Sequence, residues 1–206
     1  MLKIWGRASS VNVQKVLWCA EELGLPFERI DIGGPFGGNR DAAYLAMNPN
    51  AVVPTIEDDG FVLWESNTIV RYLAAKHGMG RLCPSDLQRR ADGERWMDWQ
   101  LTTLNKDMVT LFWGLIRTAP DKRDNAAIAG ALEALGDIWG RLDRHLADRA
   151  FIGGDALTMA DIPAGALAYR WFNLQVKRPA LPRLEAWYRR LTERPGYAKH
   201  VMIVMT

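Results

Sequence analysis

Three short segments of this chain hold residue types that could together grip a small zwitterionic peptide. Val53 and Pro54 stand a short distance before Glu65 and Ser66, and Ser10 lies far upstream of both pairs. A proline in a strand-forming stretch points to an edge position, where main-chain N–H and C=O groups can pair with an extended peptide. A carboxylate suits an ammonium group, and the N–H groups at a helix start suit a carboxylate. The segments therefore predict a site for an amino-acid head group.

Ser9 and Ser10 lie between an expected first strand and an expected first helix. A hydroxyl group at a helix N-terminus can donate a hydrogen bond to a thiolate, and the helix dipole favours the same anion. A free thiol has a pKa of about 8.5, so only a small fraction of it is thiolate near neutral pH. A site that lowers this pKa raises the thiolate fraction and so the nucleophilicity. Asn12 and Arg7 are second candidates for the donor role. This chemistry needs no separate base.

Each feature also has a purely structural interpretation. The bond between Val53 and Pro54 could be cis, or a trans proline could only blunt a strand edge. Ser66 could simply cap a helix, with the acid Glu65 beside it. Either serine before the first helix could likewise be an ordinary cap. Residues 158–161 (Thr-Met-Ala-Asp) form a capping-box pattern, which we assign to folding and not to catalysis.

The first eighty residues alternate strand and helix patterns. We expect strands at 2–5, 27–32, 53–57 and 61–64, and helices at 13–23 and 66–77. The glycine-rich residues 33–38 match no phosphate-binding motif and are expected to form a surface loop. The order β-α-β-loop-β-β-α is typical of a thioredoxin-like unit.

Beyond residues 79–86 the strand pattern disappears and helical periodicity continues to the end. Helices are expected from about Asp86 toward Arg117, from Asp121 to Leu146, from Thr158, and from Pro182 until Pro195 and Gly196 end the last one. The predicted fold class is therefore α+β: a thioredoxin-like N-terminal domain (1–80) followed by an all-α C-terminal domain (86–206).

Composition narrows the class of protein. The chain has 206 residues, 49% of them hydrophobic and 24% charged, with a net charge of +2, so a basic nucleic-acid or membrane surface is not expected. No apolar run is long enough for a membrane span, and no secretion signal precedes the first strand, which predicts a cytoplasmic protein. Cys19 and Cys83 make no disulfide framework. The three histidines lack metal-ligand spacing, so no metal is expected.

Five segments in register resemble the glutathione S-transferase family over nearly the whole chain. They are Ser10, residues 48–50 (Asn-Pro-Asn), Val53 with Pro54, residues 65–67 (Glu-Ser-Asn), and residues 158–162 (Thr-Met-Ala-Asp-Ile). The chain looks most like bacterial serine-type members related to the theta and phi classes. The resemblance implies a glutathione-binding N-terminal domain, a helical domain that holds an electrophile, a two-fold homodimer and a role in detoxification.

The same resemblance implies roles for individual residues. Ser10 would hydrogen-bond the glutathione thiolate, with Ser9 and Asn12 as alternatives, and Val53 beside Pro54 would pair with the cysteinyl main chain. Glu65 and Ser66 would hold the ammonium and carboxylate of the γ-glutamyl group. Many relatives place a lysine just before the Val-Pro pair, whereas this chain has Ala51 and Val52 there. Arg40 could take over its contact with the glycine carboxylate.

The electrophile pocket is expected to include Phe112, Trp113 and Arg117, although aromatic residues at helical spacing can equally be core. A cation at Arg117 would favour anionic substrates such as haloacids, and the alternative is a solvated arginine at a helix end. The leading hypothesis is conjugation of glutathione to small electrophiles. The alternatives are a glutathione-dependent peroxidase or dehalogenase, and a non-catalytic glutathione-binding scaffold.

Overall fold

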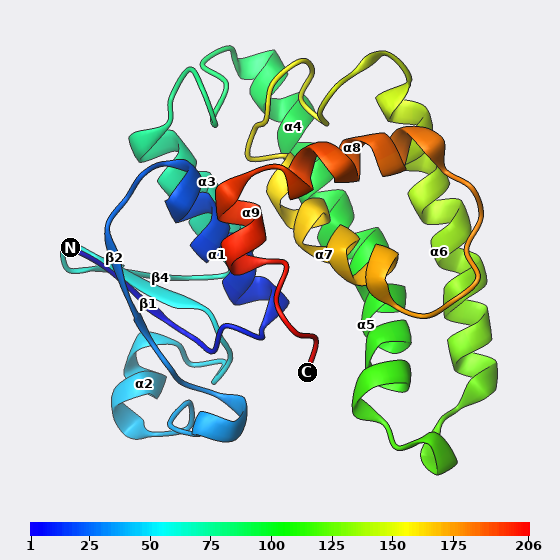
Figure 1. Cartoon of the computed structure of the whole chain (residues 1–206). Coiled ribbons are helices and arrows are strands. Elements are labelled where there is room, and N and C mark those ends of the chain that lie inside the picture. The colour runs from blue at the N-terminus through cyan, green and yellow to red at the C-terminus, as the bar shows by residue number, and fades with distance from the viewer.

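The computed structural model describes residues 1–206 and opens with a four-stranded mixed sheet (Figure 1). Its strands are β1 (Leu2–Trp5), β2 (Phe27–Ile30), β3 (Thr55–Asp58) and β4 (Phe61–Trp64). Their order is β2-β1-β3-β4, with β2 parallel to β1 and the other two pairs antiparallel. Asp59 and Gly60 turn the β3–β4 hairpin with φ angles of 51° and 87°, as the Asp-Gly signal predicts.

The sheet is covered by helices on both sides. These are α1 (Val11–Glu22), the short 3-10 helix η1 (Gly34–Phe36), α2 (Ala42–Met47) and α3 (Ser66–His77). Figure 1 shows α1 and α3 on one face and α2 beyond the other. The sequence predicted only a loop between β2 and β3; this was wrong, because η1 and α2 form there. Because α2 has six residues and buries only Tyr44, its sequence shows no apolar stripe.

The second half of the chain is helical throughout. It contains α4 (Leu87–Trp99), η2 (Gln100–Leu104), α5 (Asn105–Phe112), η3 (Trp113–Arg117), η4 (Pro120–Lys122), α6 (Asn125–His145), η5 (Leu146–Asp148), α7 (Asp161–Asn173), α8 (Pro182–Thr192) and α9 (Pro195–His200). The expected long helix from 86 to 117 is therefore present as a continuous helical segment. Its α-helical hydrogen bonding changes to π-helical at η2 and again at η3. Such turns are frequent at functional sites.

Two predicted helix boundaries were wrong. Asp121 does not open α6, because Asp124 caps it by accepting the Ala127 N–H at 2.9 Å. Pro195 does not merely end a helix; it is the first residue of α9, where a proline loses no hydrogen bond. One half of the capping box at α7 forms as predicted, since Asp161 accepts the Thr158 N–H at 2.9 Å. The Thr158 hydroxyl donates to the same carboxylate at 3.3 Å and accepts from no N–H group.

One hydrophobic core joins the two halves. It is a single cluster of 41 buried residues drawn from the sheet, α1, α3 and the C-terminal helices. Helix α1 is buried on all sides from Val13 to Ala20, because it packs against α3, α7 and α9 as well as lying over the sheet. Cys19 and Cys83 are buried and unpaired. The α+β fold class is confirmed, whereas the domain limits 1–80 and 86–206 stay a prediction.

Candidate active site

The register of the sheet brings the three predicted segments to one edge. Trp5 pairs with Thr55 on β3, and Thr55 pairs with Trp64 on β4. The turn that follows β1, the proline that precedes β3 and the glutamate that follows β4 are therefore neighbours. Pro54 and Glu65 thus flank the same end of the sheet as the turn that leads into α1.

Val53 presents an unpaired main chain at this edge. Its peptide bond to Pro54 is cis, and neither its N–H nor its C=O makes a hydrogen bond within the chain. Gly6 allows the close approach of this segment, since a Cβ atom there would lie 2.4 Å from a Val13 methyl group and 3.2 Å from the Val53 Cβ. An extended peptide could add to this edge as a further strand.

Buried polar side chains fix the segment that leads to Val53. The Tyr44 hydroxyl donates to the Val52 carbonyl at 2.7 Å, and the Asn48 amide donates to the same oxygen at 3.0 Å. Asn48 also donates to the Thr55 hydroxyl at 3.1 Å. Asn48 belongs to a motif that the sequence shows, whereas Tyr44 was not predicted because α2 was not recognised.

Helix α3 offers free N–H groups beside a free carboxylate. Its first main-chain bond runs from the Ile69 N–H to the Glu65 carbonyl, so the N–H groups of the first turn are unpaired. Glu65 adopts a left-handed φ of 72°, and its exposed side chain has no partner in the chain. Ser66 is 3% exposed. A positive helix end next to a carboxylate can bind a zwitterion.

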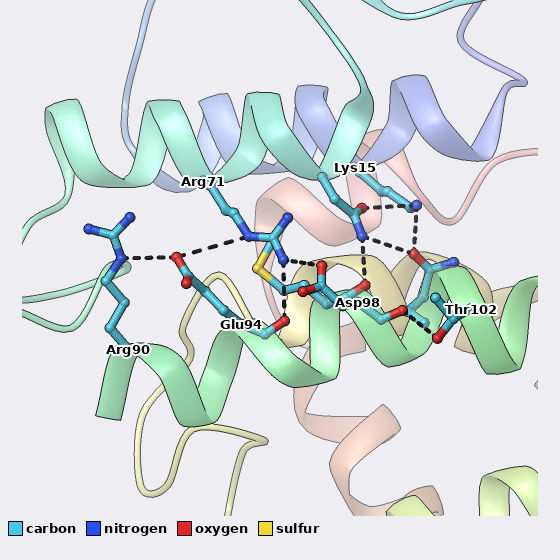
Figure 2. A network of polar contacts seen from close by, with 9 residues as sticks. Lys15, Arg71, Arg90, Glu94, Asp98 and Thr102 are labelled. Carbon is cyan, nitrogen blue, oxygen red and sulfur yellow. Dashed lines mark hydrogen bonds and ion pairs between the residues drawn. The ribbon is translucent and has the colours of Figure 1, made fainter. Parts of the chain in front are cut away.

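A fully buried lysine on α1 supports this helix start. Lys15 Nζ donates to Asn67 Oδ1 at 3.2 Å and to Gln100 Oε1 at 2.9 Å (Figure 2). It also lies 3.5 Å from Ser66 Oγ, to which it donates. Burial lowers the pKa of Lys15 from 10.5 to about 7, although Glu65 opposes the shift. The lysine therefore ties the predicted ligand site to the helical half. Nothing in the local sequence distinguishes Lys15 from a solvated helix residue.

Figure 2 also shows how α3 is held against α4. Arg71 on α3 pairs with Asp98 on α4, donates to the Glu94 carbonyl at 3.2 Å and lies 4.0 Å from the Glu94 carboxylate. Within α4, Arg90 pairs with the same carboxylate at 2.9 Å and holds it in place. Partly exposed ion pairs of this kind contribute little stability each, so we regard them as orienting the two helices.

The start of α1 leaves several polar side chains free. Ser10 is its N-terminal cap residue, but the hydroxyl makes no capping bond. The Asn12 side chain has no partner either, and Ser9 accepts only through its carbonyl, from Arg170 at 3.4 Å. Ser9, Ser10 and Asn12 are half-buried. Any of the three could meet a thiolate near the positive helix end.

The residues expected to meet an electrophile differ in exposure. Phe112 is fully buried, whereas Trp113 is 52% exposed. The Arg117 guanidinium stacks 4.7 Å from the Trp113 ring centroid and donates to the Thr206 main-chain oxygen at 3.0 Å. Arg117 is therefore held against the C-terminal segment, which lies between the two halves (Figure 1).

Arg40 lies in an exposed loop and has no partner in the chain. That loop is tied to the segment before Val53, because the Asn39 side chain donates to the Ala51 carbonyl at 2.6 Å. Arg40 is thus near the predicted peptide edge without a fixed contact there.

Other features of the molecule lie away from this edge. A surface hollow of about 490 Å³ lies between α7 and α8, lined by Phe172, Arg178, Glu185 and others, but it contains none of the predicted residues. No group of three metal-ligating side chains gathers in the structure. None of the helices is both long and apolar enough to cross a membrane.

Comparison with known proteins agrees with this arrangement. The family model of the glutathione S-transferase N-terminal domain matches residues 9–76, and that of the C-terminal domain matches residues 125–190. The chain is 45% identical to the glutathione S-transferase GstB of Escherichia coli (strain K12), covering 98% of this chain and 99% of that protein.

Two solved structures of a theta class glutathione S-transferase from Xanthomonas axonopodis pv. citri are similar over 100% of this chain. The form with glutathione bound has a TM-score of 0.96 and 49% identity, with 99% of that chain covered. The apo form has a TM-score of 0.88 and 43% identity, with 98% covered. The backbone of this chain is thus nearer to the glutathione-bound form.

Proposed function

The chain belongs to the glutathione S-transferase family, and we propose that the edge formed by Val53, Glu65, Ser66 and the start of α1 is where glutathione attacks a small electrophile. The observation that supports this most strongly is the set of unpaired groups at one end of the sheet: a free main chain at Val53, a free carboxylate at Glu65 and free N–H groups at α3. Together they complement the γ-glutamyl and cysteinyl parts of glutathione.

Glutathione would lie along this edge as an added strand. The Val53 N–H and C=O pair with its cysteinyl main chain, while Glu65 meets its ammonium group and Ser66 with the α3 N–H groups meets its carboxylate. Arg40 is the candidate for the glycine carboxylate, because Ala51 and Val52, and no lysine, stand just before Val53 and Pro54.

The thiol would then point to the start of α1. The Ser10 hydroxyl donates to the sulfur, and the helix dipole adds favourable potential, so the thiol loses its proton nearer to neutral pH. The thiolate attacks the electrophilic carbon, and catalysis consists of anion stabilisation together with positioning. Trp113 and Arg117 would border the electrophile, with Phe112 packed beneath them.

Three further expectations belong to the same proposal. Residues 1–80 would supply the glutathione site and residues 86–206 the electrophile site, in a cytoplasmic homodimer that detoxifies electrophiles. Sedimentation equilibrium tests the dimer: a single species with the mass of one chain would contradict it.

Ser10→Ala tests the thiolate role, and Ser9→Ala and Asn12→Ala test the two alternative donors. Losing one hydrogen bond to an anion should lower kcat/KM toward chlorodinitrobenzene by about ten- to a hundredfold and raise the thiol pKa of bound glutathione. Calorimetry should show glutathione binding retained. If Ser10→Ala behaves like wild type and Asn12→Ala loses activity, the donor is Asn12. If glutathione does not bind wild type at all, the proposed site is wrong.

A further inference from the structure

Three arginines converge beside the start of α1, and we call them the arginine cluster: Arg7, Arg117 and Arg170. Arg170 on α7 donates to the Ser9 carbonyl at 3.4 Å, and its guanidinium carbon lies 3.7 Å from the centroid of the Phe112 ring. Arg117 stacks on the same ring at 5.3 Å. Arg7 lies in the turn after β1, where its side chain packs over Gly34.

The three cations are close enough to oppose one another. Burial, followed by the charges of Arg117 and Arg7, lowers the pKa of Arg170 from 12.5 to about 9. Burial and then Arg7 lower the pKa of Arg117. No acidic side chain counters these effects on either residue.

No Asp or Glu side chain pairs with the cluster. Arg170 is only 7% exposed, yet its acceptor is the main-chain carbonyl of Ser9. Arg117 is the less buried of the two and donates to an oxygen of Thr206, the last residue of the sequence. Arg194 shows the usual arrangement, since it pairs with Glu22 through two nitrogen atoms. A buried cation without a counter-ion is unfavourable, and two neighbouring cations and a positive helix end make it more so. An anionic ligand would relieve that cost.

We propose that the arginine cluster binds the anionic group of the electrophile, so that the enzyme prefers electrophiles bearing a carboxylate, such as 2-haloalkanoates. This inference rests on the proposed function. Two of the three arginines belong to the helical half, and glutathione's own charged ends are accounted for at α3 and near Arg40. The thiolate carries one negative charge, which leaves capacity for a second anion.

The reaction itself explains why cations without an acidic side-chain partner are useful here. The glutathione thiolate attacks the carbon that bears the halogen; the C–S bond forms as the C–halogen bond breaks, and the halide leaves with the bonding electron pair. The carboxylate is unchanged, and no oxidant or reductant takes part. Because thiolate and carboxylate repel each other, cations around both lower the cost of bringing them together.

Matched electrophiles isolate the effect of charge. Iodoacetate and iodoacetamide share a leaving group and differ in the carboxylate, so each kcat/KM is divided by its uncatalysed rate and the acid-to-amide ratio is compared. We expect this ratio to fall at least about tenfold in Arg117→Gln and in Arg170→Gln. Arg89→Gln, an exposed arginine on α4, should keep the wild-type ratio. An equal loss for both electrophiles would overturn the proposal and assign the arginines to the thiolate.

Binding of unreactive products gives a second readout. S-carboxymethylglutathione should bind at least about tenfold more tightly than S-carbamoylmethylglutathione, and Arg117→Gln should remove the difference. If both derivatives bind wild type equally while glutathione still binds, the cluster proposal alone fails. If glutathione itself does not bind, the proposed function fails. Arg117 is partly exposed, so this variant keeps the test decisive even if Arg170→Gln folds poorly.

Discussion

Replacing the buried Lys15 by methionine should remove a specific pH dependence of stability. The folded chain holds this ammonium group away from water, where three acceptors favour its charged form and burial opposes it. Burial is the larger effect, because the pKa falls from 10.5 to about 7. The neighbouring Arg170 lowers the pKa and Glu65 raises it, but both effects are smaller.

The sign follows from proton counting. Between pH 7 and 10.5 the unfolded chain keeps the Lys15 proton that the folded chain releases, so stability rises as pH rises through this range and is lowest below pH 7. With one proton involved, the free energy of unfolding should increase by about 1.5 kcal/mol between pH 7.0 and 8.5. Below pH 7.0 the titration of His145, whose pKa burial lowers, also changes stability. Above pH 8.5 the buried Cys19 thiol has the opposite effect: burial raises its pKa, so the folded chain keeps a proton that the unfolded chain releases, and stability falls as pH rises.

Urea unfolding at several pH values across this window measures the effect. Wild type and Lys106→Met, which changes an exposed lysine on α5, should show the rise, and Lys15→Met should be nearly flat. If Lys15→Met keeps the wild-type slope, or wild type has none, the three acceptors hold the ammonium charged throughout. The inference that burial dominates at Lys15 would then be wrong.

Three further outcomes can be measured on the same protein. Tyr44→Phe removes the donor to the Val52 carbonyl and should cost about 1 kcal/mol of unfolding free energy and weaken glutathione binding several-fold by calorimetry. Asp161→Ala removes an acceptor that serves Ile152, Thr158 and Trp187, and should cost about 3 kcal/mol in urea unfolding, whereas the exposed Asp155→Ala should be neutral. Glu65→Gln should raise the glutathione Kd about tenfold, and the loss should vanish for an analogue without the α-amino group; an equal loss for both ligands would contradict the ammonium contact.

The strands and the hairpin could be predicted because their signals are local. Alternating apolar residues and the turn at Asp59 and Gly60 act within a few positions, and the structure follows them. The cap at Asp161 is local in the same sense. Helix α2 escaped prediction because a single buried side chain, Tyr44, makes no periodic pattern.

The supporting residues of the site could not be predicted from spacing. Lys15 and Arg170 stand at helix positions that are normally solvated, and their burial arises only when α1 is enclosed by α3 and α7. Arg117 was predicted as a pocket residue or a solvated helix end, and its contact with Thr206 depends on where the chain's last residues return. In each case the decisive partner is distant in sequence, so no local pattern encodes it.

Helix α1 explains why the site needs both halves of the chain. Its first turn carries the candidate thiolate donor, and Lys15 anchors the α3 helix start that would receive the γ-glutamyl group. On its other side Trp18 packs so closely on α7 that a Cβ atom at Gly165 would lie 2.9 Å from the indole ring. That close approach also brings Arg170, on the same helix, to Ser9. The charge around the thiol is therefore set by the packing of α7 on α1, and the sheet-bearing half alone could not provide it.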